Sequence, residues 1–338
     1  MKPMTTRIAV FAAVVVLAIG GAVVYLRHVG HRDAPIRGGQ SLAGQVDPAA
    51  VSAALAGPHI VFRSTALGAS YGHVAIVPLA RPDAPPVLTD LSCDRVYATS
   101  HGGVCLVADR GVTTTYRTLL LNASLGTAAT VPVPGLPSRA RSSRDGRWAV
   151  TTTFVSGHSY TDTTFSTATI VYDTSTGKSI GNLESFAFVK DGRPYRSVDI
   201  NVWGVTFAAD QQHFYATVKT KGMTHLAEGD LAQRRVELLN IRAECPSLSP
   251  DGTRIAYKLA TGPITWRLHV LDLRTRADVA VAETRSVDDQ VEWLDAGHVS
   301  YGLPRPGSAE TDVWSVPADG SGAPTRLIAD AWSPAIVR

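Results

Sequence analysis

The chain has 338 residues, of which 45% are hydrophobic and 18% charged. It is therefore long enough for one large β domain or two ordinary ones with a buried core, and its composition excludes a disordered chain. The net charge of +3 is spread through the sequence without a run of Lys or Arg, so nothing in it indicates nucleic-acid binding.

Residues 8–26 are an uncharged apolar run, roughly 28 Å long as a helix, which matches the hydrocarbon thickness of a bilayer. We expect a transmembrane signal anchor there, after a short cytoplasmic tail at residues 1–7. A cleaved signal peptide is the alternative. Basic residues flank the run on both sides, so charge alone does not set its orientation. We expect a single-pass protein of the cell membrane, with the bulk of the chain on the extracytoplasmic side.

Two of the three cysteines support an oxidising compartment. Cys93 and Cys105 belong to two candidate strands, 95–99 and 103–108, joined by a turn at His101-Gly102-Gly103. Neighbouring strands would bring the two sulfurs together, so we predict a disulfide; two buried small hydrophobic residues are the alternative. Cys245 is left over, and packing is its expected role.

Residues 27–56 contain Gly, Pro, Gln, Ser and charged residues followed by an alanine-rich patch, and they predict a flexible linker. From residue 57 onward, short β-branched runs alternate with Gly, Pro, Asp or Asn every eight to twelve residues, which is typical of an all-β domain. Residues 58–62 form a strand with nothing before it, and residues 329–338 supply the missing partner. Such a split unit closes a ring, so we predict that the C-terminal strand completes the first blade of a propeller.

Internal repeats give the number of blades. The clearest turn is Ser249-Pro250-Asp251-Gly252, followed by an apolar strand, and Ser143-Arg144-Asp145-Gly146 repeats it. The turn aspartates recur at a blade-sized period, with insertions in the second and third intervals; they are Asp94, Asp145, Asp210, Asp251 and Asp295. Residues 57–338 divided among six units give about 47 residues each, which suits a four-stranded blade. We predict a six-bladed β-propeller preceded by one transmembrane helix.

The turn and strand at residues 249–257, together with the strand at residues 268–273, resemble the repeat of the TolB-like, WD-repeat-like β-propellers. The resemblance covers residues 57–338 and is strongest in the fifth blade. In the namesake of this family, the resemblance implies, the propeller follows an α/β domain and binds a peptidoglycan-associated lipoprotein. This chain departs from that plan, because we expect only an anchor and a linker in its first 56 residues.

Two short motifs and two residue types could indicate a catalytic or metal site, and each has a simpler structural interpretation. Residues 68–72 match G-x-S-x-G around Ser70, but a strand follows where a nucleophile elbow needs a helix. Gly177-Lys178-Ser179 lacks the earlier glycine of a phosphate-binding loop. The ten histidines show no metal-binding spacing, and the aspartates at 145 and 251 suit turns better than calcium sites. We predict no catalytic residue, no metal and no cofactor.

If the propeller has a site, we expect it on the face where chain segments enter the inner strands around the axis. Exposed Trp and Arg are common binding hot spots, although packing between blades is the alternative for the two tryptophans. The candidate ligand-binding residues are Arg139, Arg141, Asp199, Asn201, Trp203, Arg242, Glu244, Asp288, Asp289, Asp330 and Trp332.

The sequence thus predicts a non-catalytic propeller that binds a protein or cell-envelope component. The alternative is a propeller lyase or glycosidase acting on a polysaccharide. A cluster of histidines or a buried carboxylate pair in the channel would favour the enzyme, whereas Ser, Thr and small apolar residues would favour the binder. A sensor that signals through the membrane helix is a third alternative, although residues 1–7 offer little to transmit to.

Overall fold

The computed structural model describes residue 20 and residues 46–111, 113–162 and 164–338. Apart from residue 20, the tail at 1–7 and the transmembrane helix expected at 8–26 lie outside the described residues, as does most of the linker expected at 27–56. No helix among the described residues is long and apolar enough to span a bilayer.

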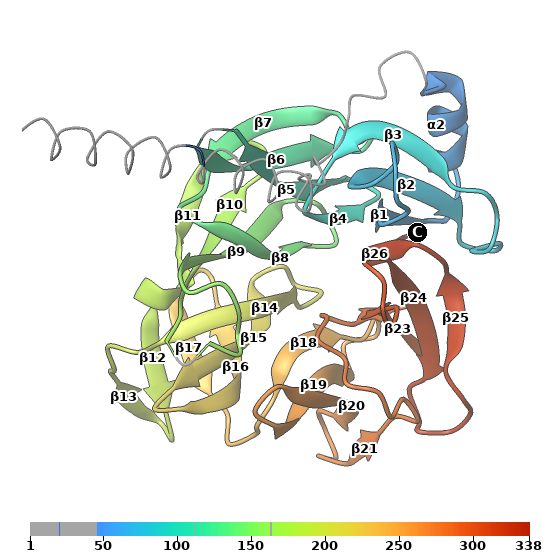
Figure 1. Cartoon of the computed structure of the whole chain (residues 1–338). Coiled ribbons are helices and arrows are strands. Elements are labelled where there is room, and N and C mark those ends of the chain that lie inside the picture. Colours follow the sequence, from blue (N-terminus) through green and yellow to red (C-terminus); the bar gives the residue numbers. More distant parts are fainter. Residues whose placement is uncertain (1–19, 21–45, 112, 163) are drawn as a thin grey trace, which may run out of the picture. The chain divides into compact units, whose positions relative to one another are not determined.

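Six sheets surround a common axis in the described part of the chain and form a six-bladed propeller (Figure 1). From the axis outward, blade 1 contains β26 (Ala331–Val337), β1 (His59–Ser64), β2 (His73–Pro78) and β3 (Val87–Ser92). Blade 2 contains β4 (Arg95–Thr99), β5 (Gly102–Arg110), β6 (Thr114–Asn122) and β7 (Thr127–Pro132). Blade 3 contains β8 (Leu136–Ser142), β9 (Trp148–Ser156), β10 (Ser166–Asp173) and β11 (Ser179–Asn182), after which comes a short 3-10 helix, η1 (Leu183–Ser185).

The other three blades follow in chain order. Blade 4 contains β14 (Asn201–Phe207), β15 (His213–Thr220), β16 (Met223–Asp230) and β17 (Arg235–Leu238). Blade 5 contains β18 (Glu244–Leu248), β19 (Arg254–Gly262), β20 (Thr265–Asp272) and β21 (Asp278–Ala280). Blade 6 contains β22 (Glu292–Trp293), β23 (His298–Pro304), β24 (Thr311–Pro317) and β25 (Thr325–Ile328).

The predicted ring closure is confirmed. Strand β26 pairs antiparallel with β1, so that His59 faces Val337 and Ser64 faces Ala331. The inner strands also contact one another in a cycle, from β4 through β8, β14, β18 and β22 to β26 and back to β4. The chain therefore supplies the innermost strand of its first blade last.

Blade 4 carries an addition that the repeat alone did not locate. Strands β12 (Ala187–Lys190) and β13 (Arg193–Tyr195) form a hairpin whose first strand pairs in parallel with β17, at the outer edge of the blade. This hairpin is the insertion expected in the second interval between turn aspartates. The third interval, from Asp210 to Asp251, contains no extra strand among its residues, so the second expected insertion is wrong.

The strands are apolar because each blade packs against two neighbours. In β2, Val74 and Ile76 enter the core between blades 1 and 2, whereas Ala75 and Val77 enter the core between blades 1 and 6. All four side chains are fully buried. At about 25 cal/mol per Å² of apolar area removed from water, such two-sided burial stabilises every blade interface. The alternating side chains of one strand thus tie three blades together.

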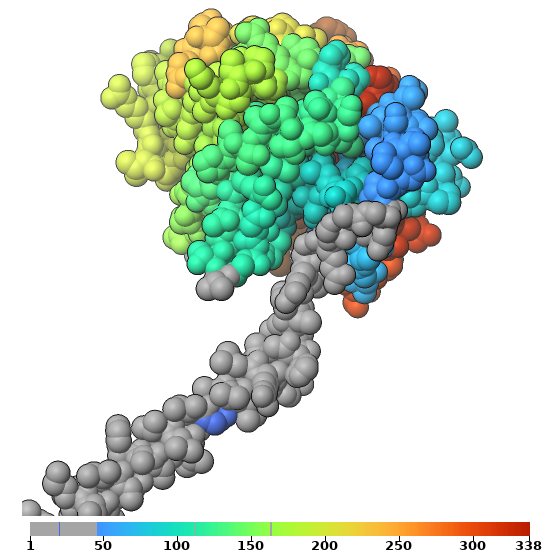
Figure 2. Space-filling view, turned by 90° about the horizontal axis from the view of Figure 1, so that it is seen from above, coloured from blue at the N-terminus to red at the C-terminus, as the bar shows by residue number. Residues whose placement is uncertain are grey.

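The last part of the expected linker is a helix. Residues Pro48–Leu55 form α2, which begins after Asp47, whose carboxylate accepts a hydrogen bond from the Ala49 amide at 2.9 Å. Alanine is the best helix former and proline suits the first turn, which explains the helix at this position. Its Val51 and Leu55 side chains pack on the core of blades 1 and 2, and Figure 2 shows α2 on the outside of the ring.

The repeated turn has the same hydrogen bonds in blades 3 and 5. Ser249 donates to Asp251 at 2.5 Å, and Asp251 accepts from the Thr253 amide at 3.1 Å. Ser143 and Asp145 are bonded in the same way, at 2.6 Å. Gly252 has a φ of +72°, a left-handed conformation that favours glycine. The Ser-x-Asp-Gly pattern therefore fixes the turn that leaves an inner strand.

Candidate functional site

The propeller has two faces, because its strands run alternately up and down. We call the face at which the inner strands begin the start face, and the face at which they end the end face. Connections between blades and between the second and third strands of a blade lie on the start face. The repeated Ser-x-Asp-Gly turns lie on the end face. The sequence analysis placed the candidate site on the start face.

A charged cluster of buried Lys258, Arg139 and Asp289 with exposed Asp288 lies in the channel on its start side. Lys258, which is fully buried on β19, binds Asp288 at 2.5 Å, and Arg139 on β8 lies 3.5 Å from the same carboxylate. Arg95, at the beginning of β4, lies 3.7 Å from buried Asp289. Burial alone would raise the pKa of Asp288, but attraction to Lys258 and Arg139 outweighs it and lowers that pKa. The cluster therefore holds the Asp288 carboxylate ionised.

A second buried group spans the channel nearer the end face. Arg141 on β8 forms an ion pair with Glu292 on β22, and it donates hydrogen bonds to Ser247 at 3.3 Å and to the Val291 carbonyl at 2.9 Å. The Tyr97 hydroxyl donates to Glu292 at 3.3 Å. Burial raises the pKa of Glu292, against the attraction of Arg141. Blades 2, 3, 5 and 6 thus meet in one hydrogen-bonded group.

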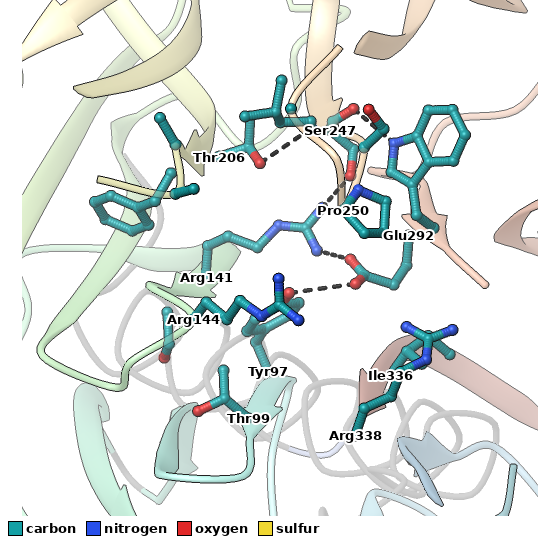
Figure 3. A pocket seen from close by; sticks show the side chains of 18 of the residues that line it. Tyr97, Thr99, Arg141, Arg144, Thr206, Ser247, Pro250, Glu292, Ile336 and Arg338 are labelled. Carbon is teal, nitrogen blue, oxygen red and sulfur yellow. Dashed lines mark hydrogen bonds and ion pairs between the residues drawn. The ribbon is translucent and has the colours of Figure 1, made fainter. Parts of the chain in front are cut away.

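A pocket of about 170 Å³ opens beyond this group, at the end-face mouth of the channel (Figure 3). Backbone and side chains from all the inner strands reach it, together with two of the repeated turns. The residues that line it are Tyr97, Thr99, Ser100, Arg141, Ser142, Arg144, Thr206, Phe207, Ala208, Ala209, Ser247, Leu248, Ser249, Pro250, Gly252, Glu292, Trp293, Ile336, Val337 and Arg338.

The pocket lining carries a surplus of positive charge. Its charged side chains are three arginines, of which Arg141 is paired, and one glutamate, Glu292. Arg144 is exposed and makes no hydrogen bond or ion pair with any other described residue. Arg338 donates only to the Leu294 carbonyl. Figure 3 shows both guanidinium groups beside the buried pair. Among the described residues, neither guanidinium forms an ion pair with a carboxylate, although the charge of Arg338 lies near enough to Glu292 to favour its ionised form.

Four of the predicted residues gather at the channel. Arg139, Asp288 and Asp289 belong to the cluster on the start side, and Arg141 lines the pocket at the other end. The start-side residues are held by each other and by Lys258. Of the candidate ligand-binding residues, only Arg141 lines the end-face pocket.

Trp203 and Trp332 pack inside the protein. Trp203 is buried and stacks on Tyr160 with ring centroids 4.6 Å apart, between blades 3 and 4. Trp332 lies against Gly302 of blade 6, and the Arg95 guanidinium sits 5.1 Å from its ring. Both therefore follow the packing alternative rather than forming a free binding surface.

The other predicted residues have structural partners or lie away from the channel pocket. Asn201 accepts from the Thr167 amide at 2.8 Å, and Glu244 is buried opposite Lys258 on β19. Asp330 accepts from Arg305 at 2.8 Å where the ring closes.

Asp199 and Arg242 are exposed and lie outside the channel cluster. Asp199 accepts from Ser197 and Thr220 in the connection before β14. Arg242 borders a separate hollow of about 630 Å³ between blades 4 and 5.

Five pocket residues at or after the end-face ends of the inner strands were not among the predicted site residues. These are Tyr97, Ser247, Glu292 and Arg338 at the pocket, and Arg144 in the repeated turn. A signal was present, because Arg144 occupies the variable position of the Ser-x-Asp-Gly turn, where Pro250 stands in blade 5. Among the described residues, no group of three or more His, Cys, Asp or Glu side chains is placed to hold a metal ion.

No family model matches the sequence, and no curated protein matches it. Solved structures do match. TolB from Acinetobacter baumannii aligns with a TM-score of 0.56 and 15% identity, over 83% of this chain and 67% of that one. A chain of a nidogen/laminin complex aligns with a TM-score of 0.54 and 12% identity, over 83% of this chain and 98% of that one.

A puromycin-hydrolyzing peptidase from Mycobacterium tuberculosis aligns more weakly, with a TM-score of 0.48 and 13% identity over 77% of this chain and 42% of that one. The structural neighbours include TolB-like six-bladed β-propellers. Identities of this size show the fold alone.

Proposed function

We propose that this chain is a non-catalytic binding propeller, anchored in the cell membrane by residues 8–26 and displayed on the extracytoplasmic side. Its ligand is a protein or cell-envelope component that presents a carboxylate or another anionic group to the end-face pocket. The proposal rests on one observation: Arg144 and Arg338 face this pocket, and among the described residues neither forms an ion pair with a carboxylate.

Three features support binding through this pocket. Hydrogen bonds between guanidinium and carboxylate groups are stronger than those between neutral groups and give orientation as well as affinity. The floor is rigid, because Arg141 and Glu292 are buried and bonded to each other. The pocket is small, at about 170 Å³, so a chain end or a single acidic side chain fits better than a folded surface.

The enzyme alternative has less support. A lyase or glycosidase needs a carboxylate or histidine that is free to exchange a proton with the substrate. In the described channel, Glu292 is bonded to Arg141 and Tyr97, and Asp288 is bonded to Lys258. Asp289 accepts from the Gly302 amide at 3.0 Å. Each of these three carboxylates is therefore bonded to a structural partner.

The proposal is tested with the full-length chain and a hexaglutamate peptide, with hexaglutamine as the uncharged control ligand. The variant R144A/R338A removes the two unpaired cations of the pocket. The matched variant R81A/R274A removes two exposed arginines from other end-face turns and changes the net charge equally. Calorimetric titration at low and physiological salt measures each affinity.

We expect the pocket variant to weaken hexaglutamate binding by roughly tenfold or more, because each lost charged hydrogen bond contributes on the order of 1.5–3 kcal/mol. The matched variant should bind as the parent does. Equal weakening in both variants would show a diffuse electrostatic effect and contradict the pocket. A shortened glycan recovered after incubation with envelope polysaccharide would instead establish the enzyme alternative.

A further inference from the structure

Exposed apolar side chains gather on the start face, opposite the pocket. Six large hydrophobic residues are strongly exposed among the described residues, and only Val279 lies on an outer strand. The other five lie on loops or strand ends of the start face, in blades 1, 3, 4 and 5; they are Leu67, Val155, Val198, Met223 and Ile264. Burial of such side chains against a partner is favourable, and their restriction to one face indicates an interaction surface.

Blade 4 presents the densest part of this surface, which we call the blade 4 edge. It consists of residues 190–199, from the inserted hairpin to the approach to β14, and residues 219–223 around the β15–β16 turn. The two segments are bonded together. The Tyr195 hydroxyl lies 3.0 Å from the Thr220 hydroxyl, and the Lys221 amide donates to Asp199 at 2.6 Å. Val198 and Met223 therefore lie on two segments that are bonded to each other. Figure 1 shows the inserted hairpin, β12 and β13, at the outer edge of the ring.

The blade 4 edge is also basic. It carries five Lys or Arg residues and two aspartates. Asp199 accepts from Ser197 and Thr220, and Asp191 accepts from Asn240 at 2.9 Å. Arg193 and Arg196 are exposed, and their side chains make no hydrogen bond or ion pair with the other described residues. Cations without partners thus surround two exposed apolar side chains.

We propose that the start face, led by the blade 4 edge, rests on an anionic lipid surface. Lipid headgroups offer phosphates to the arginines and, a few ångströms deeper, an apolar phase to Val198 and Met223. A hydrated polysaccharide would provide the charge without the apolar phase. A rigid acidic protein would need a cavity for Val198, which is fully exposed on a projecting loop. A bilayer accommodates such a tip without a matching shape.

This contact is separate from the proposed ligand site. A propeller that lies on its start face turns the end-face pocket away from the membrane. The pocket then stays open to an extracytoplasmic ligand while the blade 4 edge is covered.

The native cysteines allow a direct test. Cys93 and Cys105 are joined to each other and Cys245 is fully buried, so an introduced cysteine is the accessible thiol of the described chain. The full-length variant V198C is labelled with an environment-sensitive nitrobenzoxadiazole dye. S124C, an exposed position on an end-face turn of blade 2, is the control. Both are reconstituted in phosphatidylcholine vesicles with and without phosphatidylglycerol, so that any contribution of residues 8–26 is common to the two.

In the anionic vesicles, we expect the emission of the dye at position 198 to move to shorter wavelength and to increase roughly twofold or more, because the dye enters the headgroup boundary. The emission of the dye at position 124 should not change. The variant R193E/R196E/K221E should abolish this change. The matched variant R81E/K178E/R274E, which reverses two arginines and one lysine on end-face turns, should retain it. Circular dichroism confirms that both variants are folded.

Three results would overturn the proposal. The first is an unchanged dye at 198 in anionic vesicles, and the second is an equal change at 124. The third is the same change produced in solution by poly-L-glutamate without vesicles, because the surface would then bind an acidic protein rather than lipid. The pocket variant R144A/R338A should leave the dye response at 198 intact, so failure of the ligand site and failure of the lipid contact are distinguishable.

Discussion

Arg141 and Glu292 form an ion pair across the channel, although they lie 151 residues apart in the chain. Arg141 belongs to blade 3 and Glu292 to blade 6, which face each other across a ring of six. Because both side chains are buried, the pair connects opposite sides of the ring directly. The pair stabilises the fold only when both residues are present, because either one alone would be a buried charge without a partner.

Removing one member of this pair should be costly. We expect Glu292→Leu to lower the free energy of unfolding by about 3–5 kcal/mol, because it leaves the buried Arg141 guanidinium without its carboxylate. The double variant R141M/E292L should lose less than Glu292→Leu alone, since no buried charge remains. Urea unfolding followed by fluorescence measures both. A single variant as stable as the parent would show that water reaches Arg141 in the channel.

The disulfide gives a second prediction. Cys93 lies in the connection between β3 and β4, just before the candidate strand expected to carry it, and is joined to Cys105 on β5 with the Cα atoms 5.5 Å apart. Closing a loop of this length restricts the unfolded chain, so C93S/C105S should lose about 3 kcal/mol. Unfolding in urea with and without reductant checks this. Reductant should lower the stability of the parent to that of the variant and leave the variant unchanged.

The architecture was predictable because its signals are local. Turn residues such as Asp251 and Gly252 indicate where one strand ends and the next begins. The strand at His59 has no strand before it in the sequence, so it needs a partner from elsewhere in the chain. The pocket was less predictable, since it depends on which ends of the inner strands meet. Tyr97, Arg141 and Glu292 have no shared motif, and only the closed ring brings them together. The inserted hairpin was visible as extra length, but its pairing with β17 was not.

Ring closure itself can be tested by truncation. Deleting residues 329–338 removes β26, exposes the inner edge of β1 and opens the cores that contain Ala331 and Ala335. We expect the truncated protein to aggregate or unfold, because an exposed edge strand pairs with other chains. Size-exclusion chromatography and circular dichroism measure this. Arg338→Ala, which removes one exposed side chain, is the control and should remain folded and monodisperse.

Gly204 tests the close packing of adjacent inner strands. It has a φ of +62°, and a Cβ atom there would lie 2.6 Å from the Cys245 Cα atom of blade 5. Gly204→Ala should therefore cost about 2 kcal/mol or more, from backbone strain and overpacking together. Gly192→Ala is the matched control, because Gly192 has a φ of +71° but no atom within 4 Å of the added methyl. Thermal unfolding should show a larger loss of stability for Gly204→Ala than for Gly192→Ala. Equal losses would mean that backbone strain at positive φ accounts for the whole effect and that overpacking adds nothing.

The closure of the ring should also be sensitive to acid. Arg305 binds Asp312 at 2.7 Å and Asp330 at 2.8 Å, and the Asp330 amide donates to Asp312 at 3.0 Å. Burial alone would raise the pKa of Asp312, but its bonds to Arg305 and the Asp330 amide outweigh burial and lower that pKa. A carboxylate whose pKa is lowered by folding stabilises the native state fully above its unfolded pKa of about 3.9, and this stabilisation is lost as the pH falls through the folded pKa.

Asp312→Asn should therefore destabilise the protein at neutral pH, by about 1.5–3 kcal/mol for a charged hydrogen bond, and should reduce the further loss seen on acidification. Urea unfolding between pH 6 and pH 3 gives the free energy of unfolding of the parent and of the variant as a function of pH. Asp319→Asn changes an exposed turn carboxylate of the same blade and is the matched control. Asp312 and Asp330 join β24 to the segment that begins β26. If Asp312→Asn leaves the pH dependence of the free energy of unfolding unchanged, the acid sensitivity arises elsewhere in the protein.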